Sequence, residues 1–162
     1  MSDFSFDIVS RVDRQNLADA VNQTEREIAT RFDLKNSKSS IELAGLEVTV
    51  LADDELKRKN VVDILQSKCV KRGVPLKALQ YGKPEPAAGG TVRQVITCAQ
   101  GIAKDKAKTI TEAIKSAKLK ANTQIQDEQI RVSSKSKDEL QKAITLVQEL
   151  PLEFPVQFVN YR

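Results

Sequence analysis

The order of apolar and polar residues describes one short pattern that the chain carries twice. Phe4, Phe6 and Ile8 alternate with polar residues, as in a strand with one buried face. Apolar residues at helical spacing follow, then a hairpin, a second helix and a last strand. This succession runs from residue 4 to about 80 and again from about 92 to 161. The chain therefore reads as two copies of a β-α-β-β-α-β unit.

Corresponding residues recur at one fixed spacing in the two copies. The pairs are Ile41 with Ile125, Val48 with Val132, and Glu55-Leu56 with Glu139-Leu140. The elements expected in the first copy are a strand at 4–8, a helix ending near Phe32, a hairpin at 41–50, a helix at 55–71 and a strand at 76–80. Those expected in the second are a strand at 92–98, a helix at 102–118, a hairpin at 121–132, a helix at 136–150 and a strand at 156–162. In the helix at 55–71 we expect Leu56 to face inward with Val61, Ile64, Leu65 and Cys69.

This pattern predicts an α+β fold made of two small domains, each an antiparallel sheet with helices on one face. The length of 162 residues suits two such domains. Residues 81–90, YGKPEPAAGG, form the one stretch rich in proline and glycine and are the candidate linker. Ferredoxin-like folds of this kind bind nucleotides and nucleic acids on the open sheet face or between domains, but the fold alone does not fix a function.

The composition narrows the class of protein. Apolar residues make up 40% of the chain, which indicates a folded protein. No apolar run is long enough to span a membrane, and the first ten residues do not resemble a signal peptide. Cys69 and Cys98 are the two cysteines and are interpreted as small buried residues in a reduced, cytoplasmic protein.

Several longer segments resemble one bacterial family, the YajQ family of small nucleotide-binding proteins. They are SFDIVS at 5–10, REIATRFDLK at 26–35, VDILQSKCVKRGV at 62–74, PLKAL at 75–79, TVRQ at 91–94, QGIAKDKAKTI at 100–110, IKSAKLKANTQIQ at 114–126, QIRVSSKSKDELQ at 129–141 and QFVNYR at 157–162. The resemblance implies two ferredoxin-like domains similar to RNA-recognition folds, with their first strands exchanged. The first domain would then cover 11–99 and include the strand at 92–98, the second would combine 1–10 with 100–162, and 81–91 would link them.

The resemblance also implies a ligand class. Family members are associated with nucleotide or nucleic-acid binding, including GTP, tRNA and cyclic di-GMP, and the last group act as effectors that contact a transcription regulator. This sequence departs from the family pattern at Asn36, Asp127 and Ser134, where glycine is frequent. Ser134 bears on any phosphate contact that the backbone of that turn would make.

Basic residues are the candidate phosphate ligands, because arginine and lysine pair with phosphate oxygens. The formal charge is +4, and the surplus lies after residue 90, where 12 basic residues face 8 acidic ones. The candidates for a compact nucleotide are Arg26, Arg31, Lys35, Lys38, Lys68, Lys71 and Arg72. The candidates for a nucleic-acid backbone or a protein partner are Lys104, Lys106, Lys108, Lys115, Lys118 and Lys120. A plain solvated helix face explains the second set equally well.

Signals of catalysis are weak. The chain has no histidine and no G-x-x-x-x-G-K-S/T loop, so we expect no catalytic residues, no metal and no cofactor. Asp53, Asp54 and Glu55 are interpreted as residues at a helix N-terminus rather than as a Mg²⁺ site. The strands LEVTV and QIRVS lack aromatic residues, so we expect electrostatic, salt-sensitive contacts instead of base stacking on the sheet.

Three functions remain open at this point. The first is a non-enzymatic nucleotide-binding protein. The second is an RNA-binding module that uses the lysine-rich helix at 102–118. The third is an adaptor that binds a transcription regulator.

Overall fold

The computed structural model describes residues 3–98 and 100–162, which fall into two compact units. The N-terminal unit comprises residues 12–99, and the C-terminal unit combines residues 1–11 with 100–162. Within the described residues there are two antiparallel sheets and four α-helices. This arrangement is compatible with the predicted pair of ferredoxin-like domains.

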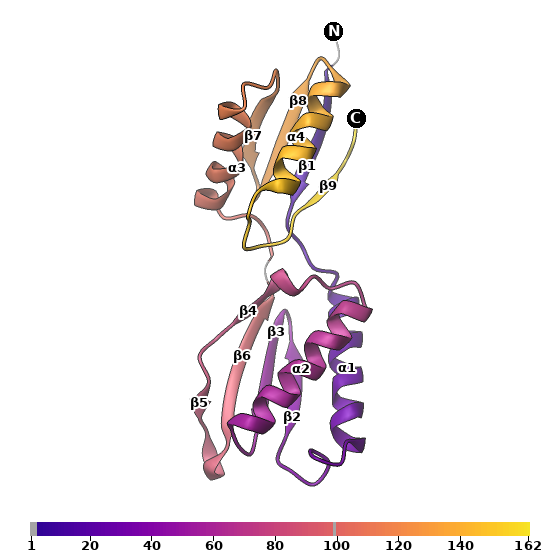
Figure 1. Ribbon diagram of the computed structural model, residues 1–162, viewed down its shortest axis with the longest axis vertical. Helices are drawn as coiled ribbons and strands as arrows, with labels where there is room; N and C mark the ends of the chain where they lie inside the picture. The colour runs from indigo at the N-terminus through magenta and orange to yellow at the C-terminus, as the bar shows by residue number, and fades with distance from the viewer. Residues whose placement is uncertain (1–2, 99) are drawn as a thin grey trace. The chain divides into compact units, whose positions relative to one another are not determined.

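The N-terminal unit is a five-stranded sheet with two helices on one face (Figure 1). The strand order is β2-β3-β6-β4, and β5 pairs with β6. The strands are β2 (Ser40–Ala44), β3 (Glu47–Ala52), β4 (Leu79–Tyr81), β5 (Glu85–Pro86) and β6 (Val92–Cys98), and the helices are α1 (Arg14–Thr30) and α2 (Glu55–Lys71). Asp13 caps α1 and Asp54 caps α2, because their carboxylates accept first-turn N–H groups.

The C-terminal unit is a four-stranded sheet of order β7-β8-β1-β9, again with two helices on one face (Figure 1). Its strands are β1 (Phe4–Val9), β7 (Asn122–Gln126), β8 (Gln129–Ser134) and β9 (Gln157–Val159), and its helices are α3 (Lys104–Ser116) and α4 (Lys137–Glu149). The tight β7–β8 turn is closed by Asp127 and Glu128, both in left-handed backbone with φ of 52° and 62°. Ser136 caps α4 as the sequence predicts.

Each unit has its own apolar core between sheet and helices. In the N-terminal unit the alternate residues Val48, Val50 and Ile96 are buried against the helices. In the C-terminal unit Phe6 and Ile8 are fully buried, and Phe4 packs against the same core, as the alternation predicts. Cys69 and Cys98 are buried free thiols, which also confirms the expectation.

Three local expectations differ from the structure. Helix α1 ends at Thr30 rather than near Phe32, whose side chain is 90% exposed, because Arg31 adopts extended backbone. Leu56 lies in the first turn of α2 and is 69% exposed, so the prediction that it faces inward is wrong. Residues 81–91, expected as a linker, run along the sheet edge, where β5 pairs with β6.

No helix in the described part of the chain combines the length and the apolar character that a membrane crossing requires.

Candidate nucleotide-binding surfaces

The predicted phosphate ligands of the N-terminal unit lie along the antiparallel pair of helices α1 and α2. Two of them are already neutralised. Arg31 Nε lies 2.8 Å from Asp33 Oδ1, and Lys68 Nζ lies 2.9 Å from Glu27 Oε1. A phosphate at either cation would have to compete with a carboxylate.

A group of cations without carboxylate partners surrounds the end of α2. Arg72 follows the last turn of α2, and its guanidinium lies against the side-chain amide of Gln23 on α1, whose oxygen accepts a hydrogen bond from it when the amide is turned toward Arg72. Lys71 is exposed beside it, and Arg26 lies one turn after Gln23 on α1. Arg26, Lys71 and Arg72 make no ion pair among the described residues. We call these three residues the α2-end cations.

The remaining two candidates lie toward the other end of the helix pair. Lys35 Nζ lies 5.4 Å from the centroid of the Phe32 ring. Lys38 donates its backbone N–H to Asp53 Oδ1 at 3.0 Å. Since Gln23 contacts Arg72 while Asp33 contacts Asn60, the helices run antiparallel and separate these residues from the α2-end cations. The seven predicted ligands therefore do not form one pocket.

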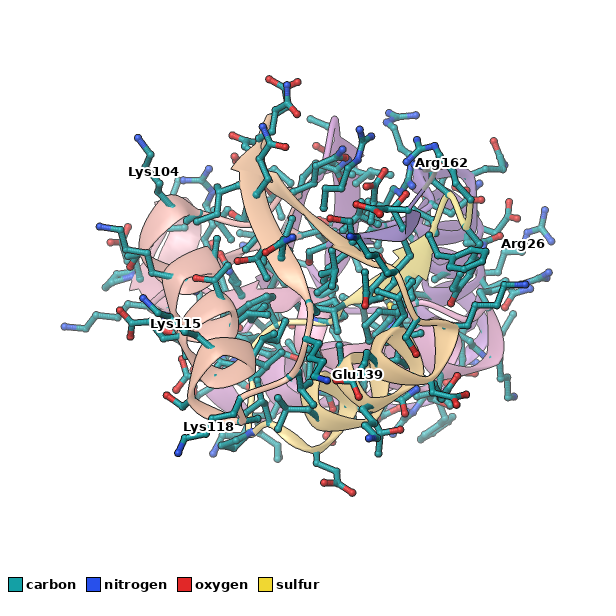
Figure 2. The ribbon with its side chains drawn as sticks, turned by 90° about the horizontal axis from the view of Figure 1, so that it is seen from above. Arg26, Lys104, Lys115, Lys118, Glu139 and Arg162 are labelled. Carbon is teal, nitrogen blue, oxygen red and sulfur yellow. The ribbon has the colours of Figure 1, made fainter. Side chains whose placement is uncertain are left out.

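The lysine-rich surface of the C-terminal unit is more uniform. Lys104, Lys108 and Lys115 recur at helical spacing on α3 and are exposed, and Figure 2 shows Lys104, Lys115 and Lys118 projecting outward. None of these lysines has an ion-pair partner within residues 3–98 and 100–162. We call Lys104, Lys108, Lys115 and Lys118 the α3 lysines.

Two further predicted lysines are engaged within the unit. Lys106 Nζ lies 5.4 Å from the centroid of the buried Phe154 ring. Lys120 donates its backbone N–H to Glu139 Oε2 at 2.9 Å. Ser134 closes the same turn, since its hydroxyl donates to the carbonyl oxygen of Lys120 at 2.6 Å and accepts from the Ser136 N–H at 3.1 Å. Ser134 is buried, so its hydroxyl serves the fold and is not presented to a ligand.

A groove lies beside the C-terminal half of α3. It is lined by Thr111, Lys115, Asn122 and Thr123, among others, and has a volume of about 500 Å³. One side of this groove is β7, the edge strand of its sheet. Polar side chains and unpaired backbone groups at an edge strand suit a hydrogen-bonding ligand.

The open face of the C-terminal sheet carries a buried carboxylate. Asp7 Oδ1 accepts a hydrogen bond from Arg131 Nε at 3.0 Å, and Asp7 Oδ2 accepts one from Asn160 Nδ2 at 2.8 Å. Burial alone would raise the pKa of Asp7, but these hydrogen bonds and the nearby guanidinium groups outweigh it and lower the pKa below 3.8. No aromatic side chain belongs to β3 or β8, so neither strand offers a stacking platform.

A cavity that the sequence did not predict lies on the helix-covered side of the same sheet. Its volume is about 400 Å³, and Phe4, Tyr161, Lys137 and Gln141 are among its lining residues. Two signals point to it in the sequence. Tyr161 is a large aromatic residue next to an arginine, and Lys137 and Gln141 are four residues apart on a helix.

Neither a cluster of metal-ligating side chains nor a reactive thiol occurs among the described residues. No group of three or more acidic or cysteine side chains there could hold a metal ion. Burial raises the pKa of Cys69 to about 12, with a further contribution from Cys98, and raises the pKa of Cys98 to about 11. Both groups are therefore protonated thiols near neutral pH and are poor nucleophiles.

A family model described as "Nucleotide-binding protein YajQ-like" matches residues 4–162. This chain belongs to the YajQ-like family. A protein of Desulforamulus reducens named "Nucleotide-binding protein" is 55% identical over 159 residues, which cover 98% of this chain and 96% of that protein. A protein of the same name from Desulfitobacterium hafniense is 52% identical over 160 residues, covering 99% and 98%. The relatives are named for binding and not for a reaction.

Proposed function

We propose that the protein binds a nucleotide without catalysing a reaction and holds the phosphate groups at the α2-end cations. The observation that carries the proposal is that Arg26, Lys71 and Arg72 are cationic and face no carboxylate among the described residues. Arginine can bind a phosphate with two parallel hydrogen bonds, which favours a defined site. The family relation supports the same ligand class.

Lys68 lies one turn before Arg72 and would assist if a phosphate displaced Glu27. Arg31, Lys35 and Lys38 are predicted to contribute less, because they lie farther along the helix pair or already have a carboxylate or aromatic partner. A phosphate at the C-terminal end of α2 is also repelled, since the C-terminal end of a helix carries a partial negative charge. Lys71 and Arg72 offset that charge, so the experiment must separate ligand binding from helix stability.

The test is calorimetric titration with GTP and with cyclic di-GMP at low and moderate salt. Arg26→Gln and Arg72→Gln are expected to weaken binding about tenfold or more each, because each removes a charge-assisted contact. Arg93→Gln is the matched control, since it removes an exposed arginine of β6 in the same unit that is not among the predicted phosphate ligands. Circular dichroism of each variant checks that α1 and α2 remain folded. Full binding by both Arg26→Gln and Arg72→Gln would exclude this site.

The α3 lysines support a second candidate function, which is binding of single-stranded RNA. Their exposure and lack of ion pairs favour contacts with successive phosphates along the helix. The affinity is then expected to fall linearly with salt on a log–log plot, with a slope of about 0.7 for each phosphate neutralised on a single strand. The variant that combines Lys104→Gln, Lys108→Gln and Lys115→Gln should reduce that slope by about two.

Filter binding with a short unstructured RNA at several salt concentrations measures this slope. Changing the RNA sequence should matter little, because no aromatic residue lies on β3 or β8. An RNA complex that is insensitive to salt, or a triple variant with an unchanged slope, would contradict this candidate.

We further propose that the first strands of the two repeats are exchanged between domains bounded near residues 11 and 99. The pairings β1–β8 and β6–β3 support the proposal. Without exchange, the first strand of each repeat would pair with a strand of its own repeat, because consecutive elements usually lie next to each other.

A further inference from the structure

The cavity in the C-terminal unit is formed where the C-terminal tail meets β1. The N–H of Arg162 donates to the carbonyl oxygen of Ser5 at 2.9 Å, and the N–H of Ser5 donates to the carbonyl oxygen of Arg162 at 3.2 Å. This reciprocal pair continues the β-sheet past β9 and fixes the tail beside β1. Figure 1 shows β1, α4 and β9 close together in this unit.

The pairing places an exposed aromatic ring at the cavity. The Tyr161 ring centroid lies 6.1 Å from that of Phe6, at an interplanar angle of 34°. Phe6 is fully buried, whereas Tyr161 is 65% exposed. Leu140 and Ile144 add apolar surface from α4. The cavity therefore combines an apolar floor with an aromatic rim that water contacts.

The polar groups at the cavity carry positive charge. Lys137 Nζ lies 4.9 Å from the centroid of the Phe4 ring, and Gln141 follows one turn later on α4. Arg162 also lines the cavity, although its guanidinium lies 3.8 Å from Asp7 on the other face of the sheet. No aspartate or glutamate is among the lining residues. Lys137 is therefore the cation that an anionic group would meet here, and no acidic residue of the lining competes for it.

We infer that this cavity binds a purine nucleoside monophosphate, with the base against Phe4 and Tyr161 and the phosphate near Lys137. The volume of about 400 Å³ lies within the range of about 300–1,000 Å³ that is usual for small-molecule sites. Purines offer a flat π-surface for stacking, and the Gln141 amide can donate to and accept from a base edge. The inference rests on the proposed nucleotide binding and adds a second site, in the other unit, where a base binds.

This site is distinct from the α2-end cations, which belong to the N-terminal unit. At the α2-end cations only phosphate recognition is proposed, because the groups there are three cationic side chains and the amide of Gln23. In the C-terminal unit Phe4, Phe6 and Tyr161 are among the lining residues and offer aromatic surface to a base. The two sites consequently predict different sets of variants that lose binding.

The experiment is calorimetric titration of the full chain with GMP and AMP. Tyr161→Leu is expected to weaken binding about fivefold or more, which is the lower end of base stacking on an aromatic residue. Lys137→Gln should have an effect of similar size by removing the phosphate contact. The matched controls are Tyr81→Leu, which alters an exposed tyrosine of the other unit, and Lys135→Gln, which removes an exposed lysine outside the cavity.

Each outcome bears on a different statement. Loss of binding in Tyr161→Leu and Lys137→Gln, with unchanged controls and circular dichroism, supports the cavity. Binding that persists in both variants but is lost in Arg72→Gln overturns the cavity and leaves the proposed nucleotide function intact. No binding of GMP or AMP by the unaltered protein overturns the cavity, and the absence of GTP and cyclic di-GMP binding as well refutes the proposed function. If Tyr161→Leu changes the circular dichroism spectrum, the result for Lys137→Gln decides, because that variant alters an exposed residue.

Discussion

Replacing Asp7 by asparagine tests how the C-terminal unit holds both of its chain ends. The side chain of Asp7 is 1% exposed and accepts hydrogen bonds from Arg131 and Asn160. Asn160 adopts left-handed backbone with φ of 57°, a conformation that a hydrogen bond to Asp7 helps to hold. Asp7→Asn keeps the shape of the side chain but removes its charge and turns one acceptor into a donor.

The expected cost is about 2 kcal/mol of unfolding free energy. A hydrogen bond to a charged group contributes about 1.5–3 kcal/mol, and a neutral one about 1 kcal/mol. The variant loses one charge-assisted bond outright and weakens the other. The side chains of Arg131 and Arg162 are 40% and 49% exposed, so water replaces part of their lost interaction with the Asp7 carboxylate. The cost in unfolding free energy therefore stays below that of breaking a fully buried ion pair.

The cost depends on pH in a direction that the structure determines. Burial opposes ionisation of Asp7, but the hydrogen bonds prevail and the folded-state pKa lies below the ordinary value of 3.8. The carboxylate therefore stabilises the fold fully above pH 3.8, and this contribution is lost as the pH falls through the lowered folded-state pKa. The difference between the two proteins should shrink at acidic pH.

Urea unfolding followed by tyrosine fluorescence measures the difference. In a Tyr81→Phe background Tyr161 is the one remaining tyrosine, and it lies in the same unit as Asp7. Asp3→Asn, at an exposed position near the same strand, is the matched control. An Asp7→Asn protein within about 0.5 kcal/mol of the parent at neutral pH would refute the reasoning, because surface substitutions commonly cost that little. A deficit that stays constant into acid would show that charge is not its source.

Three further predictions concern local structure. Gly82→Ala should destabilise the N-terminal unit by about 1–3 kcal/mol in urea unfolding, because a Cβ there would lie 2.7 Å from the carbonyl oxygen of Val95; an unchanged midpoint would contradict this. Cys69 and Cys98 should resist a thiol reagent near neutral pH until urea unfolds the chain, since burial raises both pKa values to about 12 and about 11. Asp54→Ala should cost about 1 kcal/mol by removing the cap of α2, measured by thermal unfolding monitored at the helical circular dichroism band.

The hydrophobic pattern predicted the four helices and most of their buried residues, with Leu56 of α2 as an exception. Alternation identifies which residues of a strand face a core, as at Phe6 and Ile8, but it does not name the neighbouring strand. The pattern therefore does not predict that β1 pairs with β8 or that β6 pairs with β3. The exchange of the first strands between domains is implied by the resemblance to a family and stays a proposal. Strand partners depend on contacts between distant segments, which periodicity does not contain.

Residues 81–91 show why composition alone misjudged a segment. Proline and glycine suggested a free linker, yet Gly82 donates its N–H to the Val95 carbonyl oxygen at 2.8 Å and accepts from Gln94 Nε2 at 2.8 Å. The absence of a side chain at Gly82 permits this close approach to β6. Glycine is therefore needed at position 82 because a side chain would collide with β6.

The candidate site was predictable as chemistry but not as geometry. The sequence lists the cations, but the acids that neutralise some of them come from other elements, as Glu27 does for Lys68. RNA-recognition folds carry stacking aromatic residues on the third strand of the domain, and neither LEVTV nor QIRVS contains one. Tyr161 is instead an exposed aromatic residue beside β1, because its neighbour Arg162 forms a reciprocal backbone pair with Ser5.

The two proposed sites recognise different parts of a nucleotide. The α2-end cations of the N-terminal unit offer charge beside an amide, so affinity there should follow the number of phosphates and depend little on the base. The cavity at Tyr161 offers aromatic surface with fewer cations, so affinity there should follow the base and depend little on added phosphates. A ligand with two bases and few charges would therefore favour the C-terminal unit, whereas a nucleoside triphosphate would favour the N-terminal unit. Which unit loses binding on substitution then identifies which half of the ligand the protein recognises.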